Sequence, residues 1–147
     1  MPTHPLARAA ATLLLSALTL TVSAENRALG TDEVGTLLAG NTLQGESQLE
    51  RFRDRPDRHF QIYLHPAGTL VVRNFEGDTD TGRWTVTDEG LFCNQYRHTR
   101  RGMRKCYAVE PRDGGFALRD SGTGRISTLF TVREGAAEWL EGGNPTE

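Results

Sequence analysis

Two short segments on either side of a basic turn constrain the fold of this chain most. Residues 91–96 and 104–109 are rich in aromatic and apolar side chains, and a polar stretch that contains Gly102 separates them. Two such runs joined by a short polar segment with glycine are typical of a β-hairpin. The sequence therefore predicts a hairpin here, and it carries both cysteines of the chain.

Cys93 and Cys106 lie on opposite arms of this hairpin. If the turn is centred on residues 99–100, the two cysteines face each other, and a non-hydrogen-bonded antiparallel site brings their Cβ atoms close enough for a disulfide. A turn centred on residues 101–102 would require a twist or a bulge for the sulfurs to meet. We expect a structural disulfide, because the pair lacks the CxxC spacing of redox and metal sites.

The amino terminus has the pattern of a secretory signal peptide over residues 1–24. His4 and Arg8 precede an apolar stretch, residues 9–22, which is too short and too rich in threonine and serine for a membrane span. Small residues lead up to an expected cleavage after Ala24. We therefore expect a periplasmic or secreted protein, and an even number of cysteines suits an oxidising compartment.

The remaining residues, 25–147, are expected to form one domain, since a chain of this length can bury a substantial core. Lysine and arginine together number 17, against 19 aspartates and glutamates, which gives a formal net charge of −2. This balance gives no overall attraction to nucleic acid. No segment of the mature chain is apolar for long enough to cross a bilayer.

One short amphipathic helix is predicted over residues 31–39. Thr31 is the expected cap and Gly40 the expected stop. The apolar residues at helical spacing on one face are Val34, Leu37 and Leu38. Such a helix is too short to be stable alone, so we expect it to cover one end of a sheet.

The rest of the chain reads as short strands at nearly even spacing. Strand patterns cover residues 41–49, 58–65, 69–75, 82–87, 91–96, 104–109, 116–119 and 125–133. The connections, including a solvated run of mixed charge at residues 50–58, are too short for crossover helices, so the strands are antiparallel. A meander must hide its edges in a closed barrel or in two packed sheets. We expect a mainly β fold, an up-and-down barrel of about eight strands with a lipocalin-like outline.

Strand alternation assigns bulky residues to the barrel interior. They are Phe60, Ile62, Leu64, Leu70, Val72, Trp84, Val86, Phe92, Tyr96, Tyr107, Val109, Phe116, Leu118, Ile126, Phe130 and Val132. So many large side chains favour a filled centre over a deep pocket. The same alternation places the disulfide on the outer face.

The order of these features resembles a family of small exported bacterial proteins, the DUF995-type domain of unknown function. The shared features are a signal peptide, a short helix ending in Gly40-Asn41-Thr42-Leu43, the turn with Pro66 and Gly68, Gly82-x-Trp84, Leu91-Phe92-Cys93 and Cys106-Tyr107. The family has no assigned catalytic residues, so the resemblance implies location in the cell envelope and fold more than activity.

The sequence offers little support for catalysis or for a metal. There is no GxSxG nucleophile motif and no phosphate-binding glycine-rich loop. His59 and His65 share a strand face but lie about 20 Å apart, too far to bind one metal together. Residues 78–82 resemble a calcium loop only weakly, without its terminal glutamate. We expect no catalytic residue, metal or cofactor.

The basic turn is the clearest functional signal. Its cationic candidates for an anion site are Arg97, Arg100, Arg101, Arg104 and Lys105. Arginine side chains recognise carboxylates and phosphates well. The alternative interpretation is a solvated turn whose charge discourages aggregation.

These features favour an exported binding protein without enzymatic activity, whose ligand is a small or anionic molecule. One alternative is an inhibitor or assembly factor that acts on another envelope protein through the basic hairpin. A weaker alternative is a hydrolase or isomerase that uses His59 or His65 at the mouth of the barrel.

Overall fold

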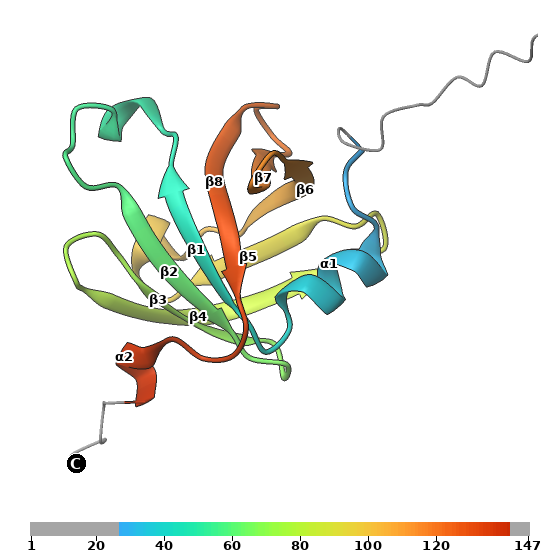
Figure 1. Ribbon diagram of the computed structural model, residues 1–147, viewed down its shortest axis with the longest axis horizontal. Coiled ribbons are helices and arrows are strands. Elements are labelled where there is room, and N and C mark those ends of the chain that lie inside the picture. The colour runs from blue at the N-terminus through green and yellow to red at the C-terminus, as the bar shows by residue number, and fades with distance from the viewer. Residues whose placement is uncertain (1–26, 142–147) are drawn as a thin grey trace, which may run out of the picture.

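The computed structural model describes residues 27–141, so the expected signal peptide lies outside the described residues. The chain forms a closed antiparallel barrel in which each strand pairs with the next, and the last strand pairs with the first (Figure 1). The strands are β1 (Thr42–Ser47), β2 (His59–Leu64), β3 (Thr69–Arg73), β4 (Thr79–Val86), β5 (Phe92–Tyr96), β6 (Lys105–Arg112), β7 (Gly115–Asp120) and β8 (Ile126–Arg133). The predicted mainly β fold and up-and-down barrel are confirmed.

β4 and β6 extend beyond their predicted ends by three residues each, and β7 by one residue at each end. β4 begins at Thr79, because the polar residues that read as a turn continue the pairing with β3. β6 runs through Pro111, which the sequence assigns to a turn. Since β6 pairs with β5 only as far as Tyr107, Pro111 lies where the strand has a neighbour on one side alone, and a missing N–H group is tolerated there.

The predicted helix is present as α1 (Thr31–Leu38), but Thr31 is not its cap. The carboxylate of Glu33 accepts a hydrogen bond from the Gly30 N–H at 2.7 Å. The Thr31 hydroxyl donates instead to the carbonyl of Thr87 at 2.9 Å, which ties the helix to the β4–β5 turn. Gly40 follows the helix with a φ of +76°, as its role as a stop requires.

The helix closes one end of the barrel, and the core lies beneath it. Val34 and Leu38 of α1 are fully buried among the inward side chains of the strands. The buried core also includes Leu43, Ile62, Leu64, Leu70, Val72, Trp84, Phe92, Tyr96, Tyr107, Val109, Leu118 and Phe130. Of the predicted interior residues only Ile126 is absent from this cluster and its margin. An irregularity in the β7–β8 pairing shifts the register there, so Ile126 pairs with Arg119 and Thr128 pairs with Leu118.

The opposite end of the barrel is surrounded by the longer connections. They include η2 (Glu50–Phe52), between β1 and β2, and η3 (Thr99–Gly102), between β5 and β6. Figure 1 shows the β1–β2 connection at the upper left, away from α1 at the right. A final helix, α2 (Glu138–Glu141), lies outside the barrel, where the Trp139 indole donates to Gln61 Oε1 at 2.5 Å. No helix in the described part of the chain is long and apolar enough to span a membrane.

Candidate ligand-binding site at the open mouth of the barrel

A cavity of about 540 Å³ lies inside the barrel at the end opposite α1. Its floor is apolar and includes Ile62, Val72 and Leu118. This volume falls within the range of about 300–1,000 Å³ that is typical of small-molecule sites. The predicted filled centre is thus correct for the helix end and wrong for this end, because Ser47 and Thr128 stand where larger side chains would be needed to fill it.

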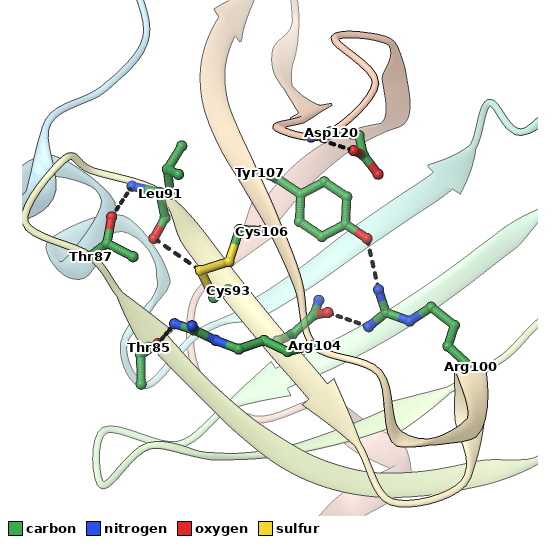
Figure 2. Close-up of a disulfide and its surroundings, with 11 residues drawn as sticks. Thr85, Thr87, Leu91, Cys93, Arg100, Arg104, Cys106, Tyr107 and Asp120 are labelled. Atoms are coloured by element: carbon green, nitrogen blue, oxygen red, sulfur yellow. Dashed lines mark hydrogen bonds between the residues drawn. A yellow bond between two sulfur atoms is a disulfide. The ribbon is translucent and has the colours of Figure 1, made fainter.

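Arg100, from the basic turn, is part of the wall of this cavity. Its Nη1 donates to the hydroxyl of Tyr107 at 2.9 Å, and its Nη2 donates to Asn94 Oδ1. The guanidinium also lies 4.8 Å from the centre of the Tyr96 ring. These three partners are 9%, 4% and 7% exposed respectively, and Figure 2 shows Arg100 extending from the turn towards Tyr107. The turn therefore places one cation against the buried polar residues of the barrel.

The backbone of the turn is held in an uncommon conformation that directs Arg100 inward. Arg100 and Arg101 have φ values of +56° and +55°, in the left-handed region that costs a non-glycine residue about 1–2 kcal/mol. One carboxylate oxygen of Asp80, on β4, accepts hydrogen bonds from the N–H groups of His98 at 3.0 Å and Thr99 at 2.7 Å. These contacts anchor the start of the turn to the neighbouring strand and offset the strain.

The same hydrogen bonds determine the ionisation of Asp80. Partial burial acts to raise the pKa of this carboxyl group, but the donors of Thr99, His98 and Thr81 outweigh it, so the pKa lies below its ordinary value. Asp80 is therefore negatively charged at neutral pH, and its oxygens are occupied by backbone donors.

Among the ion pairs of the described residues, none includes Arg100. The carboxylates that line the cavity are otherwise engaged or lie at its rim: Glu76 pairs with Arg55 at 2.7 Å, and Asp78 is exposed. The positive charge of Arg100 is half-buried without a carboxylate in contact, an arrangement that leaves it available to a ligand.

The two tyrosines beside Arg100 remain protonated across the physiological range. Burial raises the pKa of Tyr96 and of Tyr107, although the nearby Arg100 charge opposes the change. Tyr107 accepts a hydrogen bond from Arg100, and Tyr96 accepts one from Asn94 Nδ2 at 3.4 Å. Neither hydroxyl donates a hydrogen bond within residues 27–141, so both protons can be offered to a ligand.

The five cationic candidates of the turn do not converge on one site. Lys105 forms an ion pair with Asp120 at 3.3 Å. Arg104 reaches the hydroxyl of Thr85 at 3.4 Å, and Figure 2 shows it on the other side of the hairpin from Arg100. Arg97 and Arg101 are exposed. Of the five, only Arg100 lines the cavity.

The rim of the cavity includes residues that the sequence assigns to a solvated loop. Arg51 lies over the ring of Phe52 at 4.7 Å, and Arg55 lies over the ring of Phe75 at 4.5 Å. The two phenylalanine rings meet edge to face at 5.1 Å between their centres. The aromatic residue inside the charged run at 50–58 is the one sequence signal that could have indicated this contact.

The disulfide joins Cys93 to Cys106, and the two residues are directly paired between β5 and β6. This register confirms the turn centred on residues 99–100. The bond lies on the strand face opposite Phe92 and Tyr107, as the alternation predicts. Because each cysteine immediately precedes a partner of Arg100, namely Asn94 or Tyr107, the bond fixes the spacing of those two partners.

The histidines considered for catalysis lie elsewhere. His59 Nδ1 is 3.0 Å from Asp57 Oδ1 outside the barrel mouth, and His65 Nδ1 accepts from the Ala67 N–H group at the helix end. Neither lines the cavity. Within residues 27–141 no three His, Cys, Asp or Glu side chains are grouped so that they could hold a metal ion.

Fold and cavity together define a small disulfide-bonded β-barrel that is plugged at one end and open at the other. Comparison with family models, curated proteins and solved structures finds no match for the chain. Its function must therefore be argued from the site itself.

Proposed function

We propose that this chain is an exported binding protein that holds a small ligand in the open mouth of its barrel. The observation that carries the proposal is the cavity of about 540 Å³ with Arg100 in its wall, unpaired with any carboxylate among the described residues. A half-buried cation beside an apolar floor costs free energy in the empty protein, and an anionic or acceptor-rich ligand recovers it.

Binding is favoured over catalysis by the chemistry of the lining. The side chains in contact with Arg100 are Asn94, Tyr96 and Tyr107. The raised pKa values of the tyrosines keep them from acting as bases near neutral pH. His98 also borders the cavity, but it is exposed to solvent at the mouth. Neither His59 nor His65, the residues that an enzymatic alternative would use, borders the cavity.

Export is the second part of the proposal. The secretory pattern of residues 1–24 and a disulfide within the barrel both support it. Intact-mass measurement and amino-terminal sequencing of the native protein test it, and the expected first residue is Glu25. A native chain that begins at Met1 would contradict export.

Membership of the DUF995-like family stays a prediction.

Filling the cavity tests the binding site. Thr128→Phe places a ring among the inward residues of β8, while Thr131→Phe makes the same change at an exposed position of that strand. Titration with anilinonaphthalene sulfonate, an anionic aromatic dye, is expected to give fluorescence with the wild type and the exposed variant and little with Thr128→Phe. Ser47→Leu serves as a second filling variant, and circular dichroism verifies the fold of each.

Native mass spectrometry of protein from the envelope provides the complementary measurement. We expect a retained small molecule with the wild-type protein and its loss with Thr128→Phe. Equal dye binding by the filled and the exposed variants, together with no retained molecule, would remove the support for a ligand in the barrel.

A protein partner is the second candidate, and one observation favours it. Met103 is 57% exposed on the outer side of the basic turn, next to exposed Arg104 and close to exposed Arg101. A photo-crosslinking residue at position 103 tests it in intact cells. A crosslinked partner that disappears with Arg101→Gln and Arg104→Gln, but persists with Thr128→Phe, would support this surface as an interface.

A further inference from the structure

We infer that the ligand is a monoanionic carboxylate with an apolar body, and that its carboxylate binds at Arg100. This inference rests on the proposed small-ligand function and names the chemical class that the same cavity accepts. It follows from the donors around Arg100, from the balance of charge along the wall and from the nature of the floor.

The hydrogen-bond donors around Arg100 indicate the chemistry of the ligand's head group. The Arg100 guanidinium has more N–H groups than its two acceptors, Tyr107 Oη and Asn94 Oδ1, can satisfy. The hydroxyl groups of Tyr96 and Tyr107 accept hydrogen bonds within the protein, so their protons are also available to donate to a ligand. A ligand group that meets these donors must supply several acceptor atoms and no donor. A planar carboxylate meets this requirement and matches the fork of an arginine.

The charged side chains along the cavity wall favour a ligand with a single negative charge. Arg55 and Glu76 neutralise each other at the rim in an ion pair of 2.7 Å. Among the residues that the structure describes, the rim also carries one further cation, Arg51, and one further carboxylate, Asp78; both are exposed to solvent and their charges offset each other. Asp80, on β4, stays ionised because its backbone donors hold its pKa low, and its carboxylate binds the N–H group of Thr99, the residue before Arg100. A dianion, such as a phosphate monoester, would be opposed by Asp80, and within residues 27–141 it would find Arg100 as the one cation in contact with the buried Asn94 and Tyr107. A single negative charge suits this site better.

The apolar floor of the cavity indicates that the rest of the ligand is apolar. Ile62, Val72 and Leu118 line the cavity below the arginine, and all three are buried. Below them the barrel is filled by the core under α1, including Leu64 and Phe92. The cavity therefore ends within the barrel, which suits one apolar chain or ring of moderate length.

Matched ligands separate these requirements by isothermal titration calorimetry. Decanoate and decanol share one body, and decyl phosphate adds a second charge. We expect the wild-type protein to bind decanoate at least about ten-fold more tightly than decanol, as one charge-assisted contact implies. Decyl phosphate is expected to bind more weakly than decanoate. Phenylbutyrate and phenylbutanol repeat the comparison with an aromatic body.

Variants assign the contact to one residue. Arg100→Gln is expected to lower the affinity for decanoate by about ten-fold or more and to leave decanol binding unchanged. Arg101→Gln removes the same charge from the adjacent, exposed position and is expected to change decanoate binding less than about two-fold, since exposed charges act weakly through solvent.

The outcomes distinguish this inference from the proposed function. If decanol and phenylbutanol bind as tightly as the two carboxylates, the cavity is a ligand site but the carboxylate assignment is wrong. If decyl phosphate binds most tightly, or if Arg101→Gln weakens decanoate as much as Arg100→Gln does, the assignment also fails. If none of these ligands binds the folded protein, both the inference and the proposed function are overturned.

Discussion

Asp80 illustrates how one side chain can determine the geometry of the site. Its carboxylate binds the N–H groups of His98 and Thr99, and Arg100 follows directly in a left-handed conformation. Without this anchor, the strain at residues 100 and 101 would favour a turn in which Arg100 faces solvent. The position of the Arg100 side chain in the cavity therefore depends on Asp80, which acts on it through the backbone of the turn.

Asp80→Asn is expected to destabilise the protein by about 1 kcal/mol near neutral pH, since the amide accepts more weakly than the carboxylate. The pKa of Asp80 is lower in the folded protein than in the unfolded chain. The stability that ionised Asp80 contributes is therefore fully present above its unfolded pKa, and it is lost as the pH falls through its folded pKa. The stability difference between wild type and variant should therefore shrink below about pH 4. Urea unfolding at several pH values measures it, and a difference independent of pH would contradict the role of Asp80.

Two glycines provide a contrasting pair of stability predictions. A Cβ atom at Gly82 would overlap with the backbone carbonyl of Gln95 on the adjacent strand, whereas a Cβ atom at Gly35 would meet no atom within 4 Å. Gly82→Ala is expected to lower the free energy of unfolding by about 2 kcal/mol or more. Gly35→Ala, within α1, should raise it by about 0.5–1 kcal/mol. Equilibrium urea unfolding measures both, and equal effects would contradict the strand geometry.

At this scale the sequence predicted the disulfide but not the site. The pairing of Cys93 with Cys106 follows from strand alternation and the symmetry of the hairpin, both of which are local patterns. The inward direction of Arg100 follows from a backbone conformation that arginine rarely adopts and from an anchor on another strand. Nothing in the spacing of the basic residues distinguishes Arg100 from Arg101, so the cluster of five could not be resolved without the structure.

At the scale of elements, the β5–β6 hairpin joins stability to binding. Its strands share three paired positions, with the disulfide at the middle one. The other neighbouring strand pairs in the barrel are longer. The bond therefore secures the shortest seam of the barrel, at the base of the turn that carries Arg100.

The double variant Cys93→Ser, Cys106→Ser is expected to lose about 3 kcal/mol of stability in the chain-entropy view of a loop this size. Its circular-dichroism spectrum should stay that of a β protein, because the core beneath α1 does not depend on the bond. Decanoate affinity should fall, since Asn94 and Tyr107 are less firmly placed, whereas decanol affinity should hold. Unfolding to a random coil, or unchanged decanoate binding, would contradict this account.

The predictability of each element depended on how local its pattern is. β2 alternates apolar and polar side chains, and its predicted range differs from the observed one by one residue at each end. The start of β4 was missed because Thr79 and Asp80 are polar residues that pair at the open mouth, where neither face is fully buried. Alternation indicates a strand only where one face meets the core.

At the scale of the whole molecule, the two ends of the barrel have different roles. The helix end is filled by Val34 and Leu38 of α1 together with inward side chains such as Leu64 and Phe92, while the other end holds the cavity. The sequence predicted bulky interior residues correctly and inferred a filled centre from them. Alternation identifies which residues point inward, but it gives neither the barrel's width at each level nor where the smaller residues Ser47 and Thr128 gather.

Hydrogen exchange provides a test of this division. Decanoate bound beside Arg100 should slow exchange in the connections around the mouth, at residues 50–56, 74–79 and 98–101, because they border the cavity. Exchange in α1 should change little, since the helix packs on a core that is already filled without ligand. Arg100→Gln at the same ligand concentration is the control and should lose most of the protection at the mouth. Protection that is strongest in α1 would place the ligand at the wrong end of the barrel and would contradict a molecule divided into a plugged support and an open site.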